Sequence, residues 1–111
     1  QIEKLVFQAD SISIPPGVED LLQEVLQFLK DYPTLNVEFG GHTNNVASDN
    51  YADDISLKRA RSVANFFIRN GIPESRVAAF GYGKKNPLVS NDTPEGRKKN
   101  QRVELKILNG Q

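Results

Sequence analysis

The chain contains no cysteine, methionine or tryptophan, and it has a single histidine, His42. Without cysteine there can be no disulfide, thiolate nucleophile or cysteine-ligated metal site. This absence is compatible with the periplasm and with the cytoplasm. The lone histidine has no metal-ligand or triad partner in the sequence, and the chain has no Gly-x-Ser-x-Gly motif. We therefore expect no catalysis, no cofactor and no metal site.

Long apolar runs are also missing, because none approaches the roughly 20 residues that a membrane-spanning helix needs. With 111 residues, of which 38% are hydrophobic and 25% charged, the chain suits one globular domain with a single core. It lacks an initiator methionine and a signal peptide. We expect residues 1–111 to be one domain excised from a longer parent protein.

Net charge is zero, but its distribution is uneven. Residues 1–54 carry 10 acidic and 2 basic side chains, whereas residues 55–111 carry 4 acidic and 12 basic ones. Such asymmetry is typical of proteins with a charged partner, although folding can also interleave the two halves. We favour the second explanation, in which each charge is simply solvated.

The spacing of apolar residues predicts the element order β-α-β-α-β-β. We assign the chain to the α/β class and expect its helices and its sheet to pack as two layers, an α+β sandwich. Helices are expected on one face of the sheet, with parallel pairing through right-handed crossovers. The first helix should begin near Pro16, which fits a first helical turn, and the second should open at Ile55. Expected strands cover residues 2–7, 37–41, 77–82 and 102–107, and the longest unstructured loop covers residues 84–100.

A candidate ligand pocket lies where the second strand ends and the second helix begins. The strand runs out through Gly40 and Gly41, and a helix start nearby would offer free N–H groups and a favourable dipole to a carboxylate. Arg59, one turn into the expected helix, could hold that carboxylate with two parallel hydrogen bonds. These residues by themselves therefore predict a binding site for a small anion.

Five ordered motifs run through residues 41–104: Gly41-His42-Thr43-Asn44, Ile55-Ser56-x-x-Arg59-Ala60, Gly71-Ile72, Gly81-Tyr82-Gly83 and Glu95-Gly96-Arg97-x-x-Asn100-Gln101-Arg102-Val103-Glu104. This set resembles the OmpA-like C-terminal domain, whose pattern is GHTD, LS-x-x-RA, GI, G-x-G and EGR-x-x-NRRVE. Phe7, Ser11, Ile14 and Pro16 resemble the family's first strand and helix entry. The resemblance thus covers nearly the whole chain, and it implies a mixed four-stranded sheet.

The resemblance also implies a function, namely non-covalent binding of peptidoglycan stem peptide. Such a domain would anchor an outer-membrane or periplasmic protein of a Gram-negative bacterium to the cell wall. Its location would be the periplasmic side of the outer membrane, and its parent would be membrane-associated. In the family, the GHTD aspartate takes the ammonium of diaminopimelate and the LS-x-x-RA arginine takes the carboxylate. The arginine corresponds to Arg59.

The family aspartate is replaced here by Asn44, and the sequence departs from the pattern at three further positions, Ala52, Ile55 and Gln101. Losing the charge would weaken the ammonium contact by about 1–2 kcal/mol, or about tenfold in affinity. Three outcomes stay open: a weaker site, compensation by a nearby acid, or a pocket for another group. Of these we expect partial compensation by a nearby acid. The acids in reach by sequence are Asp49, Asp53 and Asp54.

The predicted ligand-binding set comprises Thr43, Asn44, Asp53, Asp54, Ser56 and Arg59. Asp53, Asp54 and Ser56 have a competing interpretation as helix caps, which for the two acids we favour over ligand contact. Arg97, Asn100 and Arg102 form a supporting set, expected to hold the long loop against the sheet by hydrogen bonds to backbone carbonyls.

Two alternative functions remain open. The first is an OmpA-like fold with weakened or altered ligand specificity that acts as a periplasmic protein-interaction module. The second, ranked lower, is a nucleic-acid binder using the basic residues at 84–85 and 97–99 near Tyr82. The neutral chain, its pI near 6.8 and the lack of a recognised base-stacking motif argue against it. We expect no nucleic-acid partner.

Overall fold

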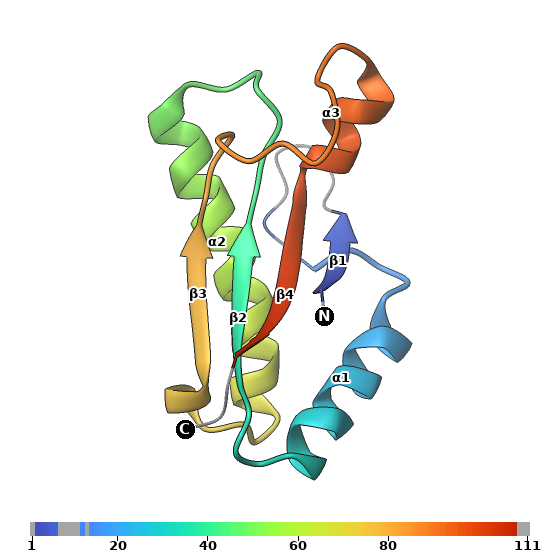
Figure 1. Cartoon of the computed structure of the whole chain (residues 1–111), viewed down its shortest axis with the longest axis vertical. Coiled ribbons are helices and arrows are strands. Elements are labelled where there is room, and N and C mark those ends of the chain that lie inside the picture. The colour runs from blue at the N-terminus through green and yellow to red at the C-terminus, as the bar shows by residue number, and fades with distance from the viewer. Residues whose placement is uncertain (1, 7–11, 13, 109–111) are drawn as a thin grey trace.

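The computed structural model describes residues 2–6, 12 and 14–108 (Figure 1). In chain order the elements are β1 (Ile2–Val6), α1 (Glu19–Asp31), β2 (Asn36–Gly41), α2 (Asp49–Arg69), the 3₁₀ turn η1 (Glu74–Arg76), β3 (Val77–Gly81), α3 (Pro94–Asn100) and β4 (Arg102–Leu108). The expected strands are therefore present. Phe7 and Ser11, which the resemblance places near the first strand, lie outside the described residues.

The described strands form one mixed sheet in the order β1-β4-β2-β3. β2 and β3 pair in parallel, as predicted, whereas β4 runs antiparallel to both β1 and β2. Gly41 is paired with Gly81 on one side and with Val103 on the other. The ends of β2 and β3 and the beginning of β4 therefore meet at one edge of the sheet, and the loops that follow or precede them are brought together there (Figure 1).

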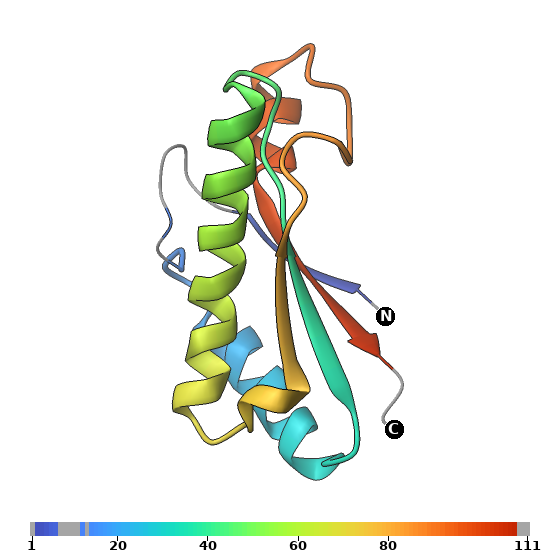
Figure 2. The same cartoon turned by 90° about the vertical axis from the view of Figure 1, so that its left-hand side faces the viewer.

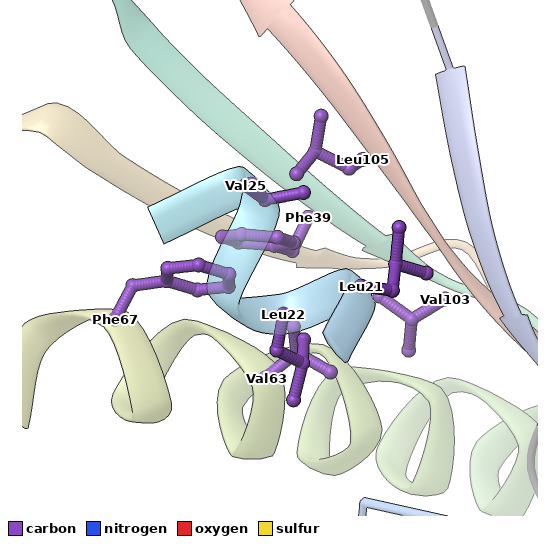
Figure 3. A pocket seen from close by; sticks show the side chains of 8 residues that line it. All are labelled: Leu21, Leu22, Val25, Phe39, Val63, Phe67, Val103 and Leu105. Carbon is purple, nitrogen blue, oxygen red and sulfur yellow. The ribbon is translucent and has the colours of Figure 1, made fainter. Parts of the chain in front are cut away.

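Helices α1 and α2 lie on the same side of the sheet, as predicted (Figure 2). Their apolar side chains pack on those of β2 and β4, with Phe39 of β2 stacked on Phe67 of α2 at 5.2 Å between ring centroids. A gap of about 20 Å³ between α1, α2 and the sheet has only hydrophobic lining residues (Figure 3). A space that barely holds one water is a packing defect of the core, not a ligand site.

The first helix begins later than predicted. Pro16 and Gly17 form a turn, and α1 starts at Glu19 after the N-cap position Val18. Gly17 has a φ of 87°, a left-handed conformation that cannot be part of an α-helix. The placement of Pro16 in the first helical turn was therefore wrong.

The second helix begins earlier than predicted, at Asp49 in place of Ile55. Ser48 is the N-cap, and its Oγ accepts a hydrogen bond from Tyr51 N at 3.3 Å. The buried face of α2 continues through Ala52, Ser56 and Arg59, and the last two are polar residues that an apolar count does not register. Asp53 and Asp54 lie beyond the first turn, so their assignment as helix caps was wrong.

The segment 84–100 is not wholly unstructured, because its last residues form α3. Thr93 is the N-cap, its Oγ1 accepts a hydrogen bond from Gly96 N at 3.0 Å, and Pro94 occupies the start of the helix. A threonine followed by proline and glutamate is a helix-start signal. The signal was present in the sequence, but the short helix of seven residues lacks an apolar period.

Candidate functional site

A pocket of about 170 Å³ lies at the edge of the sheet where β2 ends. Its walls come from the segment between β2 and α2, from the first three turns of α2, and from the residue between α3 and β4. The lining residues are Thr43, Asn44, Val46, Ala47, Tyr51, Ile55, Arg59 and Gln101. Three predicted ligand-binding residues, Thr43, Asn44 and Arg59, are thus brought together.

Arg59 is the cationic residue of this wall, and its side chain is fully buried at 0% exposure. Its Nη1 donates to His42 O at 3.4 Å, and its Nη2 donates to Gln101 Oε1 at 3.2 Å. Because α2 starts at Asp49, Arg59 lies in the third turn of the helix and not in the first. A guanidinium is the side-chain group that best matches a carboxylate, because its donors lie in one plane.

Another part of the pocket wall is a short turn that hydrogen bonds keep in shape. Thr43 N donates to Gly83 O at 2.9 Å, which ties this segment to the end of β3. Thr43 Oγ1 donates to Asn44 O at 2.9 Å, and Asn44 Oδ1 accepts from Val46 N at 3.1 Å. The Asn44 side chain therefore closes an Asx-type turn on its own backbone.

The three nearby acids lie elsewhere, and within the described part of the chain none of them lines the pocket. Asp49 is paired with Lys84 at 3.3 Å, and Asp54 is paired with Lys58 at 3.0 Å on the exposed side of α2. The Asp53 carboxylate lies beside Gly83, where any Cβ would collide with it. The structure thus brings neither Asp53 nor Asp54 together with Asn44 and Arg59.

Ser56 is buried and connects α2 to the turn after β3. Its Oγ donates to Asp53 O at 3.0 Å and accepts from Gly83 N at 3.0 Å. The helix can come this close because two strand ends are glycines. A Cβ on Gly41 would collide with the Ser56 carbonyl, and one on Gly81 would lie 2.7 Å from Leu57 N. Ser56 and these glycines therefore fix the position of Arg59 relative to the sheet.

The supporting set makes the backbone contacts that the sequence predicted. Arg97 Nη1 donates to Asn91 O at 2.9 Å, and Arg102 donates to Asn100 O at 3.1 Å and to Asn86 O at 3.0 Å. Asn100 is fully buried, and its Oδ1 accepts from the two consecutive amides of residues 88 and 89. These side chains hold the segment 84–100 in place next to the pocket.

His42 is the first residue after β2, and its ring lies next to Tyr82 and Glu104. Its ring stacks on Tyr82 at 5.3 Å, and its Nε2 is 3.8 Å from Glu104 Oε1. Nδ1 is buried and has no hydrogen-bond partner among the residues that the structure describes. Burial, reinforced by the positive charge of Arg102 and opposed by Glu104, lowers the pKa of His42 to about 4. At neutral pH the ring is uncharged, and it packs by stacking on Tyr82.

Sequence reasoning missed most of the apolar wall and one polar residue of the pocket. Val46, Ala47 and Tyr51 were not singled out, because the helix start was placed too late to bring them near Arg59. Gln101 was noted as a departure from the family pattern and not as a pocket residue. Its place beside Asn100 and Arg102 in one motif was the available signal.

The basic residues of the nucleic-acid alternative do not form one free patch. Lys84 Nζ donates to Ala47 O at 2.7 Å and pairs with Asp49, and Arg97 donates to a carbonyl of its own loop.

In residues 2–6, 12 and 14–108 no three side chains of the metal-ligating types gather into a possible ion site. No helix in this described part is both long and apolar enough to cross a membrane.

Comparison with known proteins gives matches over nearly the whole chain. A profile of the OmpA family matches residues 6–101. The chain is 36% identical over 103 residues to the peptidoglycan-binding protein ArfA of Mycobacterium bovis, a match that covers 93% of this chain and 32% of that protein. It is 34% identical over 103 residues to the probable lipoprotein YiaD of Escherichia coli, covering 93% and 47% respectively.

Among solved structures, the peptidoglycan-associated lipoprotein from Burkholderia pseudomallei is similar, with a TM-score of 0.91 and 25% identity. The similarity covers 95% of this chain and 89% of that one. The chain spans about a third of the length of ArfA and about half of that of YiaD.

Proposed function

The chain belongs to the OmpA family, and we propose that it binds the stem peptide of peptidoglycan, non-covalently and without catalysis. The observation that carries this proposal is the pocket at the end of β2, with the buried Arg59 as its cationic wall. A carboxylate of a diaminopimelate residue would contact the guanidinium, and the turn at Thr43 and Asn44 would contact the neighbouring nitrogen. Tyr51 and Ile55 would pack against its methylene groups.

The names of similar proteins support this proposal. One relative is called peptidoglycan-binding, and the similar solved structure is a peptidoglycan-associated lipoprotein. Another relative is an outer membrane porin F, which is 34% identical over 101 residues. We therefore place the domain in the cell envelope, on the periplasmic side of the outer membrane, where it would tether its parent protein to the wall.

The test is a sedimentation assay with purified peptidoglycan sacculi and three variants on one helix. Arg59→Ala removes the guanidinium, and Arg59→Lys keeps the charge but not the planar set of donors. Arg61→Ala is the matched control, because Arg61 is exposed on the same helix. A charged hydrogen bond contributes roughly 1.5–3 kcal/mol, so Arg59→Ala should lose about tenfold or more in affinity.

We expect the order of affinity to be parent and Arg61→Ala, then Arg59→Lys, then Arg59→Ala. Circular dichroism and urea unfolding of each variant separate lost binding from lost folding. A folded Arg59→Ala variant that binds sacculi as tightly as Arg61→Ala would contradict the proposed site.

A further inference from the structure

The side chain of Asn44 has a defined orientation in the pocket wall. The backbone amide of Val46 needs an acceptor, and Asn44 Oδ1 supplies it at 3.1 Å. A backbone N–H can only donate, so the amide atom that it contacts must be the oxygen. The other atom of the Asn44 amide is therefore the nitrogen, Nδ2. Among the described residues, Nδ2 has no hydrogen-bond acceptor, so the side-chain atom that Asn44 leaves without a protein partner is a donor.

An aspartate in the same place would behave differently. One carboxylate oxygen would accept from Val46 N, and the second would remain as a charged acceptor facing the ligand. Asparagine puts an N–H group where that second oxygen would be. The change from aspartate to asparagine thus removes a charge and also replaces an acceptor by a donor. An ammonium group has donors only, so it cannot form a hydrogen bond with Nδ2.

The other described residues of the pocket do not supply a negatively charged acceptor. None of the lining residues that the structure describes is an acid, and Arg59 adds a positive charge. Asp49 and Asp54 are paired with lysines outside the pocket. An ammonium in this site would meet a donor from Asn44 and the field of a guanidinium, and both interactions are unfavourable.

From this geometry we propose that the pocket selects a carboxylate whose neighbouring nitrogen is acylated. This inference rests on the proposed function and specifies its ligand. The carboxylate would contact Arg59, and the acyl carbonyl would accept from Asn44 Nδ2, which matches donor to acceptor at both places. In a peptidoglycan stem peptide, the cross-linking reaction converts the free amine of diaminopimelate into such an amide. The domain would therefore prefer cross-linked wall to uncross-linked wall.

Two small probes separate the alternatives: meso-diaminopimelate, with free amines, and its N,N′-diacetyl derivative, with both nitrogens acylated. Their affinities for the intact domain are measured by NMR titration, together with those of Asn44→Asp. Asn45→Asp is the matched control, because it adds the same charge at an exposed neighbour that does not line the pocket. The parent and Asn45→Asp should prefer the diacetyl probe, and Asn44→Asp should shift the preference towards free diaminopimelate by about tenfold.

The inference is wrong if the parent prefers free diaminopimelate, or if Asn44→Asp changes the ratio of affinities no more than Asn45→Asp does. It is also wrong if neither probe binds a domain that still sediments with sacculi. Failure of the proposed function has a different signature, because the parent would then not sediment with sacculi at all.

Discussion

Two polar segments meet at the same edge of the sheet, and they use their side chains in opposite ways. In the segment 84–100, Asn100 makes four hydrogen bonds within its own loop, and Arg97 and Arg102 bind backbone carbonyls. In the segment 42–48, Asn44 makes one side-chain bond, to Val46 N, and then faces a pocket. Asparagine therefore has two roles: in one segment its polar atoms hold the segment together, and in the other some of them are left for a ligand.

The difference follows from burial. Asn100 is fully buried, so each of its polar atoms must find a partner within the protein. Asn44 is half-buried at the pocket, where water or a ligand can satisfy Nδ2. The difference between the two segments can be tested by substituting residues in each segment separately and measuring both stability and ligand binding.

The largest effect is expected from Asn100→Ala. The substitution removes the hydrogen bonds to the amides of residues 88 and 89 and to the carbonyl of Val89, and each lost hydrogen bond costs roughly 0.5–1.5 kcal/mol. We expect the free energy of unfolding to fall by about 3 kcal/mol, measured by urea denaturation. A loss below about 1 kcal/mol would mean that this segment does not depend on Asn100.

The next effect is a pH dependence at His42, the buried first residue of the segment 42–48. Its pKa is about 4 in the folded chain and 6.5 in the unfolded chain, so the unfolded chain binds the proton more tightly between these values. The stability due to the neutral ring is complete above pH 6.5 and is lost as the pH falls towards 4. At about 1.4 kcal/mol per pKa unit, the loss between pH 7.5 and pH 5 is about 2 kcal/mol.

Urea denaturation of the parent and of His42→Gln over this pH range tests that prediction. The variant carries no titrating ring, so its stability should fall by less than that of the parent over the same interval. Equal slopes in the two proteins would contradict the lowered pKa of His42.

A smaller effect on stability is expected from Asn44→Ala, the counterpart of Asn100→Ala. The variant loses one hydrogen bond at an exposed amide, which costs about 0.5–1 kcal/mol. Its affinity for sacculi should change while its unfolding curve stays close to that of the parent. Destabilisation as large as that of Asn100→Ala would show that both segments are structural and would remove the contrast.

The smallest effect is expected from Lys58→Ala. Lys58 forms a solvent-exposed pair with Asp54 four residues earlier on α2, at 3.0 Å. Such pairs contribute about 0.3–0.5 kcal/mol, and the pair lies outside the pocket. Thermal unfolding should shift slightly and sacculus binding should not change. Loss of binding would indicate that the acids of α2 do contact the ligand.

Much of the fold could be predicted because the strands carry a clear alternation, as in β4, where Val103 and Leu105 are buried and Lys106 is exposed. The start of α2 could not, since Ala52 is the one buried residue among residues 49–54 and cannot by itself show a helical period. Arg102 lies on the opposite face of the strand from Val103, yet it is also buried, at 3% exposure. Its partners, Glu104 and two backbone carbonyls, come together only in the folded chain.

For the candidate site, the motifs predicted that Arg59 and Asn44 would lie together, and the pocket contains both. The orientation of Asn44 could not be predicted, because it depends on a hydrogen bond from the backbone of Val46. The exclusion of Asp53 and Asp54 from the pocket followed from the helix start, which shifts both acids along α2.

The most direct test of the account is a backbone chemical-shift map of the domain titrated with a soluble peptidoglycan fragment. Ligand binding at the pocket predicts that the largest changes lie in residues 43–47 and at Tyr51, Ile55, Arg59 and Gln101. Residues 84–99 should change less, because their polar side chains are bound to their own loop. Changes centred on residues 84–99, with residues 43–59 unaffected, would contradict the assignment of the pocket as the binding site.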